Sequence, residues 1–196
     1  MTNRAKIYIA WVAAVGLSLL ALGLFRWTSP NPARYLVLVL LALVASTLKL
    51  RLPGITSSMS VNFLFILLGV ADLSFSETVA MGCAAALLQS VWKAQRRPRP
   101  VQLLFNVACL AISIGVAYGG SHFALSATHT NSLILLLVLA ASLFLVTNTG
   151  LVAIVLSLAE HQPLRQAWRL CYGWAFPYYL VGAAIAGLIK IGRAHV

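Results

Sequence analysis

The chain has 196 residues, of which 61% are hydrophobic and 9% are charged. A soluble domain is about 45–50% apolar and about 25% charged, so this chain cannot cover a surface that faces water. The composition excludes a soluble enzyme, a nucleic-acid-binding domain and a disordered tail. A membrane-spanning helix takes about 20 residues, so a set of such helices connected by short loops accounts for the whole length.

Apolar segments follow one another along the chain. They are Ile7–Phe25, Tyr35–Leu48, Met59–Leu73, Ser74–Trp92, Val101–Tyr118, Ser132–Leu158 and Leu170–Ile189. The third segment runs almost directly into the fourth, which predicts a tight hairpin at one membrane face. A β-barrel needs alternating polar and apolar residues, and runs such as Leu133–Ala141 do not alternate. The sequence therefore predicts an all-α fold, a polytopic bundle of about seven transmembrane helices.

The distribution of positive charge predicts how the bundle lies in the membrane. Lys and Arg total 14 against three acidic residues, which gives a formal net charge of +11. Cations cluster in the loops of one side: Arg4, Lys6, Lys49, Arg51, Lys93, Arg96, Arg97, Arg99, Arg165 and Arg169. The other side holds Arg26 and Arg34. Because cytoplasmic loops carry the excess of Lys and Arg, we expect a cytoplasmic N-terminus.

The end of the sequence has an unusual composition. Residues Lys190–Val196 resemble the in-frame translation of a common sequencing-library adapter; a short basic tail after the last helix is the alternative. We interpret 1–189 as one integral-membrane domain and 190–196 as an artefactual tail, which is excluded from functional reasoning. We expect the natural protein to continue into a further helix.

No catalytic, cofactor or metal motif is recognised in the chain. It has no HExxH, GxSxG or Gly-rich phosphate loop, so we expect no catalytic residue, no cofactor and no metal ion. Cys83, Cys109 and Cys171 lie in apolar runs without a CxxC spacing and are interpreted as small buried side chains. His122 and His129 flank a predicted outer loop, and without a carboxylate beside them they are weak evidence for a metal or proton-sensing site.

Polar amides lie within four of the predicted spans. They are Asn62, Gln89, Asn106 and Asn148. Each lies a comparable distance from the cytoplasmic end of its span, so we predict that they converge on one polar cluster in the cytoplasmic half of the bundle. Two interpretations remain open, because such amides can join helices to each other or line a cavity for a ligand.

Asp72 and Glu77 lie at the outer end of the predicted hairpin. Ionisable groups at a membrane span can mark an ion or substrate path, which makes the pair a candidate outer-face polar site. The simpler interpretation is a hydrated acid or a charge at a helix N-terminus. Ser74 and Glu77 also have the spacing of a capping box, and this interpretation is preferred over a transport role.

Four stretches resemble a known bacterial family. They are Leu48–Gly54, Met59–Phe65, Arg96–Val107 and Phe176–Gly182. Together they are similar to the N-terminal integral-membrane sensor module, of the MASE type, of cyclic di-GMP signalling proteins. The resemblance implies a multi-pass protein of the bacterial inner membrane that precedes a cytoplasmic HD-GYP phosphodiesterase or GGDEF cyclase domain. That output domain is not in this sequence, so no catalytic residue carries over.

The function expected from this resemblance is a membrane sensory module that regulates a cyclic di-GMP enzyme. Its expected partners are the lipid bilayer, a second copy of the chain and an unknown small-molecule or membrane stimulus, with no nucleic acid. The GxxxG at Gly115–Gly119 is a candidate dimer contact. The alternative function is a small-solute transporter or its substrate-binding subunit. An intramembrane enzyme is disfavoured because no nucleophile, base or metal motif is present.

Overall fold

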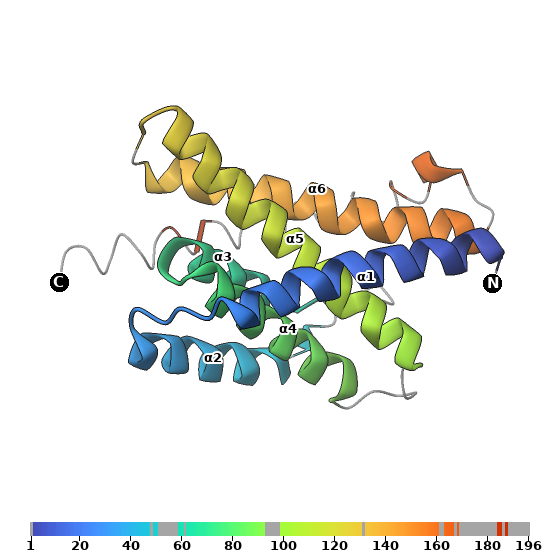
Figure 1. Ribbon diagram of the computed structural model, residues 1–196, viewed down its shortest axis with the longest axis horizontal. Coiled ribbons are helices and arrows are strands. Elements are labelled where there is room, and N and C mark those ends of the chain that lie inside the picture. Colours follow the sequence, from blue (N-terminus) through green and yellow to red (C-terminus); the bar gives the residue numbers. More distant parts are fainter. Residues whose placement is uncertain are drawn as a thin grey trace.

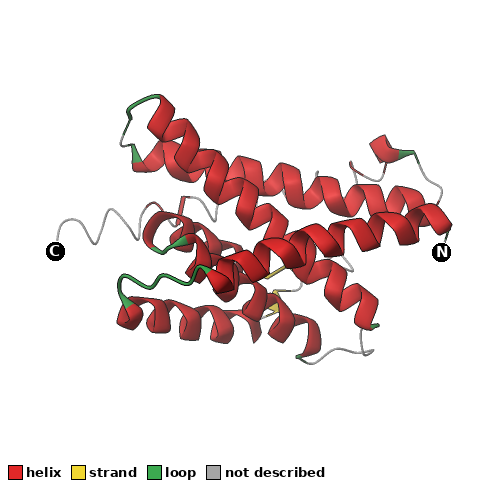
Figure 2. Cartoon of the chain, viewed as in Figure 1, coloured by secondary structure: helices red, strands yellow, loops and turns green. Residues whose placement is uncertain are grey.

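The computed structural model describes residues 2–47, 49–50, 59–60, 62–92, 99–130, 132–160, 163–166, 168, 184–185 and 187. These residues form a helical bundle with one short two-stranded ladder (Figures 1 and 2). Its elements are α1 (Asn3–Phe25), α2 (Pro32–Thr47), β1 (Lys49–Leu50), β2 (Met59–Ser60), α3 (Asn62–Asp72), α4 (Phe75–Val91), α5 (Pro100–Ala127) and α6 (Leu133–Glu160). The predicted all-α class is confirmed. Apart from residues 184, 185 and 187, the predicted span Leu170–Ile189 and the tail 190–196 lie outside the described residues.

Helix length separates the bundle into two groups. α1, α5 and α6 are apolar helices of 23, 28 and 28 residues, long enough to cross a membrane. α2, α3 and α4 are apolar but shorter, with 16, 11 and 17 residues. At 1.5 Å per residue α3 is about 16 Å long, roughly half of a bilayer core of about 30 Å. The polytopic prediction is therefore supported for the three long helices among the described residues.

α5 lies at the centre of the bundle and contacts α1, α3, α4 and α6 (Figure 1). It packs tightly against α1, where a Cβ placed on Gly16 would lie 2.4 Å from the carbonyl oxygen of Ala108. Small residues at such a crossing let two helix backbones pack without intervening side chains. One apolar core lies beneath α2, α3, α4, α5 and α6, and a second is formed mainly by α1 and α5.

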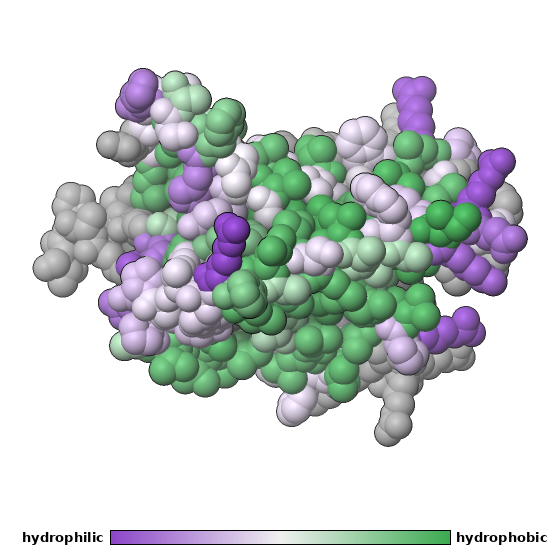
Figure 3. Space-filling model, viewed as in Figure 1, coloured by the Kyte–Doolittle hydropathy of each residue, from purple (hydrophilic) through white to green (hydrophobic). Residues whose placement is uncertain are grey.

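Large apolar side chains cover the outside of the bundle. Trp11 and Phe25 of α1 and Leu40 and Val44 of α2 are all exposed. In the space-filling view green apolar residues form the middle of the molecule, and purple polar residues gather towards its two ends (Figure 3). A surface of this kind is stable against lipid tails, because the helical backbone already satisfies its own hydrogen-bonding groups. The chain is a membrane protein.

The predicted end of the fifth span and the predicted start of the third span differ from the structure for identifiable physical reasons. The fifth span was expected to end at Tyr118, but α5 continues to Ala127, because the polar residues of this stretch lower hydropathy without breaking a helix. The third span was expected to begin at Met59, but Met59 and Ser60 pair with Leu50 and Lys49 in an antiparallel ladder. Backbone groups there are satisfied across two strands, and helix α3 begins at Asn62.

The α1–α5 crossing predicts that Gly16→Ala destabilises the protein. The new Cβ would clash with backbone atoms of Ala108, and overpacking of this kind costs about 1–3 kcal/mol. Gly119→Ala is the matched control, because a Cβ on Gly119 meets nothing within 4 Å. Thermal unfolding in detergent, followed with a thiol-reactive dye that reports exposure of the buried Cys83 and Cys109, should show a lower Tm for Gly16→Ala only. Equal Tm values for the two variants would contradict the tight crossing.

Candidate functional site

The turn between α3 and α4 is built by a capping box. Ser74 is the N-cap of α4, and its Oγ accepts a hydrogen bond of 3.3 Å from the backbone N–H of Glu77. Glu77 Oε2 in turn accepts a hydrogen bond of 2.9 Å from the backbone N–H of Ser74. The two bonds satisfy N–H groups that no helical carbonyl can reach, so the predicted capping box is confirmed. We refer to residues 72–77 as the acidic turn.

Both carboxylates of the acidic turn are buried. Glu77 is 1% exposed, and the Asp72 side chain is 2% exposed. The interpretation of these groups as hydrated acids is therefore wrong. The loop that joins α1 to α2 packs over the turn and removes it from solvent, an arrangement between segments that local sequence patterns do not specify.

The α1–α2 loop is held to the acidic turn by hydrogen bonds from serine side chains. Ser29 Oγ donates to Glu77 Oε1 at 2.6 Å. Ser74 Oγ donates to the carbonyl of Thr28 at 2.7 Å, and Ser76 Oγ donates to the carbonyl of Arg26 at 3.1 Å. These three hydrogen bonds, at Arg26, Thr28 and Ser29, hold the loop across the start of α4.

The two carboxylates are stabilised in different ways. Arg34, in the first turn of α2, forms an ion pair with Asp72 and is itself 38% exposed. Glu77 instead receives hydrogen bonds from the neutral hydroxyl of Ser29 and the backbone of Ser74, and it lies in the first turn of α4, where the helix dipole favours negative charge. Arg34 and Ser29 were not predicted as partners of these carboxylates. Arg34 could have been found, because it is one of two cations on the sparsely charged side.

Tyr118 connects the central helix to the acidic turn. Its hydroxyl donates a hydrogen bond of 3.3 Å to the carbonyl of Leu73. Its ring meets the Phe75 ring edge-on, with centroids 5.6 Å apart. The acidic turn thus joins α2, α3, α4, α5 and the α1–α2 loop through polar contacts.

The four predicted amides have different surroundings. Asn62 is 5% exposed, and its Nδ2 donates a hydrogen bond of 3.3 Å to the carbonyl of Gly82 on α4. Gln89 and Asn148 are partly buried, and Asn106 lies on the exposed side of α5. Asn62 therefore joins two helices, whereas the convergence of all four amides on one cluster stays a prediction.

The other candidates from the sequence are placed as follows. Cys83 and Cys109 are buried, as expected, and Cys171 lies outside the described residues. His122 belongs to helix α5 rather than to a loop, and His129 follows the helix end. Within the described ranges no three His, Cys, Asp or Glu side chains come together as a metal-binding group.

Comparison with protein families assigns the bundle. The MASE9 family model matches residues 10–189, nearly the whole chain. The chain belongs to the MASE9 family. The resemblance to a MASE-type membrane sensor module is thereby confirmed, and the protein is a membrane sensory module. Comparison with curated proteins and with solved structures finds no match.

The buried position of Glu77 predicts that Glu77→Gln destabilises the bundle by about 1–3 kcal/mol. The neutral amide removes the negative charge that strengthens the hydrogen bonds from Ser29 and from the Ser74 backbone. It also removes the charge that the helix dipole favours in the first turn of α4. Glu160→Gln is the matched control, because Glu160 is exposed at the end of α6. Thermal unfolding in detergent should give a lower Tm for Glu77→Gln alone, and an unchanged Tm would show that the carboxylate is not required there.

Proposed function

We propose that this chain is the sensory module of a bacterial cyclic di-GMP signalling protein that regulates a cytoplasmic HD-GYP phosphodiesterase or GGDEF cyclase domain. The observation that carries the proposal is the MASE9 match over residues 10–189, which covers the six helices of the structure apart from the start of α1. The resemblance of four separate stretches to sensor modules of this signalling system supplies the link to cyclic di-GMP. The chain lies in the inner membrane as a multi-pass protein.

The N-terminus lies in the cytoplasm in this proposal. Thr2 Oγ1 donates a hydrogen bond of 2.9 Å to the carbonyl of Leu158, so α1 begins where α6 ends. The cations Arg4, Lys6 and Arg165 belong to this end of the bundle. The acidic turn lies at the opposite end, where it is covered by the loop after α1. The positive-inside rule then places the acidic turn on the external side.

Signal transfer follows from the packing of the helices. A stimulus that prefers one arrangement of the external end shifts the population of that arrangement. α5 contacts α1, α3, α4 and α6 and also bonds to the acidic turn through Tyr118. A change in the packing of the turn therefore alters the packing of helices that run to the cytoplasmic end. The output domain is coupled to the membrane module at that end.

Catalysis belongs to the output domain and not to these helices. We propose that the chain itself binds no cofactor, acts in the lipid bilayer as part of a homodimer and recognises a small molecule or a state of the membrane. Purified chain should give no turnover of GTP or cyclic di-GMP above a detergent blank. Turnover that persists through purification would contradict this assignment.

A solute transporter is the second candidate, and one observation favours it. α3 is short and is preceded by the non-helical β1–β2 ladder, and interrupted helices often build transport sites. Genomic DNA beyond codon 189 separates the two functions. A further helix followed by an HD-GYP or GGDEF domain is the expected reading, whereas a stop codon would favour the transporter.

The proposed orientation predicts which cysteine probes react from outside the cell. In a background without Cys83, Cys109 and Cys171, Ala127→Cys at the end of α5 should react with a membrane-impermeant maleimide on intact spheroplasts. Glu160→Cys at the end of α6 should react only after permeabilisation. Both residues are exposed, so burial does not obscure the result. The reversed pattern would overturn the orientation.

The sensory role predicts that the acidic turn sets the activity of the full-length parent. Glu77→Gln should change cellular cyclic di-GMP, measured with a fluorescent reporter, by at least about twofold, because an altered turn shifts the balance between arrangements. Glu160→Gln is the control and should leave the reporter unchanged. Immunoblots must show equal membrane levels of the two variants. Equal reporter signals at equal levels would contradict a sensory role for the turn.

A further inference from the structure

The helices of the bundle differ in the length of apolar surface that they present to the membrane. On α1 the exposed apolar side chains, among them Trp11 and Leu22, lie between the cations Lys6 and Arg26. These two cations are about 30 Å apart along the helix at 1.5 Å per residue. This length matches the hydrocarbon core of a typical bilayer, which is about 30 Å thick.

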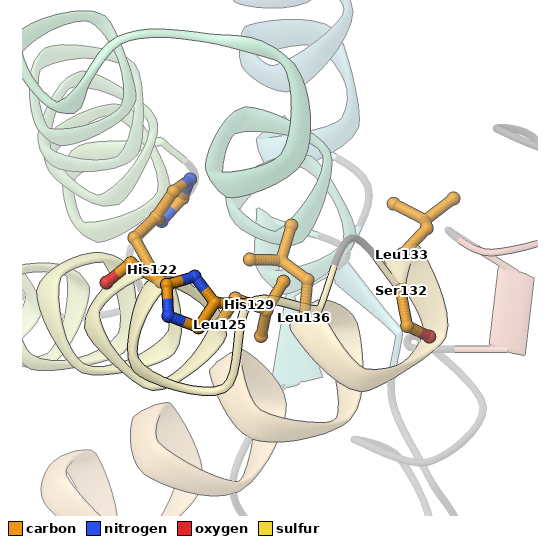
Figure 4. Close-up of a pocket in the computed structure, with 7 residues that line it drawn as sticks. His122, Leu125, His129, Ser132, Leu133 and Leu136 are labelled. Carbon is orange, nitrogen blue, oxygen red and sulfur yellow. The ribbon is translucent and has the colours of Figure 1, made fainter.

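A polar hollow marks the end of the apolar surface on the long helices α5 and α6. The hollow has a volume of about 710 Å³ and lies between the end of α5 and the start of α6 (Figure 4). Leucines form part of its lining, and its polar lining residues are His122, Ser126, His129 and Ser132. Hydrocarbon leaves such groups unpaired, so the hollow belongs at the level of the lipid head groups. Arg99 and His122 then limit the apolar part of α5, about 35 Å apart along the helix.

The side of the bundle formed by α2, α3 and α4 is shorter. Along α2, Arg34, which pairs with Asp72, is about 20 Å from Thr47 at the helix end. Along α4, Glu77 is about 23 Å from the C-cap Trp92. In Figure 1, α2 ends near the middle of the molecule, whereas α1 and α6 continue to the end at which the N-terminus lies. Two sides of one bundle therefore have different lengths.

The backbone that follows α2 is not helical. Lys49 pairs with Ser60 and Leu50 pairs with Met59 in the β1–β2 ladder, which lies near the middle of the molecule (Figure 2). A two-stranded ladder has N–H and C=O groups along its edges, and lipid tails cannot pair with them. A hydrocarbon boundary close to Thr47 keeps these edges out of the lipid.

The outer face of α2 has the composition of a surface that contacts lipid. Leu36, Leu40 and Val44 are exposed there and continue the exposed apolar surface of the other helices. The small residues Ala42 and Ala45 lie on the buried side of α2. Helices in membranes approach one another through small residues, so acyl chains fit the outer face of α2 better than a second copy of the chain does.

We propose that the α2–α3–α4 side of the bundle fits a hydrocarbon layer about 10 Å thinner than the side formed by α1, α5 and α6, and that the chain gathers phospholipids with short acyl chains beside α2. A bilayer accommodates a short helix by thinning around it, and short chains form the thinner layer with the least distortion. The long helices hold the ordinary thickness on the other side. The proposal depends on neither cyclic di-GMP nor the orientation in the membrane.

α2 also carries the ion pair of the acidic turn. Arg34, in its first turn, binds Asp72, so a force that tilts or shifts α2 acts on the turn. A change in bilayer thickness changes the mismatch at α2 and with it the favoured position of Arg34 against Asp72. Bilayer thickness is then the state of the membrane that the turn is suited to report, a step that rests on the proposed sensory function. Lipid contact in vesicles measures the thickness fit alone, so the failure of one is distinguishable from the failure of the other.

The test uses the full chain in a cysteine-free background, in vesicles of equal amounts of phosphatidylcholine with acyl chains of about 14 and about 18 carbons. Bimane on Val44→Cys reports the lipid beside α2, and bimane on Leu17→Cys is the matched control beside α1. Both positions are exposed and lie about 14–15 Å along their helices from the arginine at the acidic-turn end. When one lipid carries brominated chains, quenching measures its local fraction. Short-chain lipid should be enriched at least about twofold at Val44 relative to Leu17.

A second pair of positions measures where the hydrocarbon ends. Thr47 is partly exposed and Ala14 is exposed, and they lie about 20 and 18 Å along α2 and α1 from the same arginines. Spin labels are placed on Thr47→Cys and on the control Ala14→Cys in vesicles of the longer lipid. The label at Thr47 should be at least about threefold more accessible to a water-soluble nickel chelate, because the thinner layer ends there.

Equal enrichment of short-chain lipid at Val44 and Leu17 would overturn the proposal. A Val44 probe that neither brominated lipid quenches would also overturn it, because a second copy or another segment then covers α2. Water contact at Thr47 without enrichment of short chains would show a water-filled cavity in place of thinner lipid, with the same consequence. Leu40→Cys, also exposed on α2, should repeat the result of Val44→Cys, and matching circular dichroism spectra show that each probe reports the folded bundle.

Discussion

Burial of two carboxylates at one helical turn is the constraint on which the rest of the bundle depends. A carboxylate that leaves water needs charge-assisted partners, or its burial is costly. Asp72 meets this need with Arg34 of α2, and Glu77 with Ser29 of the α1–α2 loop and the backbone of its own capping box. These partners come from separate segments, so satisfying the charges also determines where those segments pack. The polar turn therefore organises the apolar helices around it.

The close contact between α1 and α5 stabilises the bundle through apolar packing rather than through polar groups. Lipid tails are as apolar as the side chains, so the hydrophobic effect does not drive helices together within the membrane. At the α1–α5 crossing, Gly16 and Ala108 instead allow the two helix backbones to pack directly against each other. A hydrogen bond of 3.1 Å, from the Tyr8 hydroxyl to the carbonyl of Leu151, also joins α1 to α6. Dispersion between the helices and hydrogen bonds at the two ends thus hold the bundle together.

Tyr118 connects the acidic turn to His122 at the external end of the proposed sensor. It bonds to the acidic turn on one side and carries His122 on the other. A rearrangement at either contact would move the same side chain of the central helix. This arrangement is suited to a module that reports events at one membrane face, because coupling between sites needs an element that both sites bias.

The sequence alone determined the class of protein and several local features. Its apolar composition excluded a soluble fold, its apolar runs located the six described helices, and the spacing of Ser74 and Glu77 identified the capping box. These features depend on solvent transfer or on residues a few positions apart, which a sequence displays directly. The extent of α5 and the β1–β2 ladder were not predicted, since helix continuation past Tyr118 and strand pairing do not follow from hydropathy. Only the tertiary structure decided that Asp72 and Glu77 are buried, that Arg34 is the partner of Asp72, and that His122 and His129 share a hollow. Each of these depends on how a helix is rotated about its axis or how a loop folds over its neighbour, and packing between distant segments sets both.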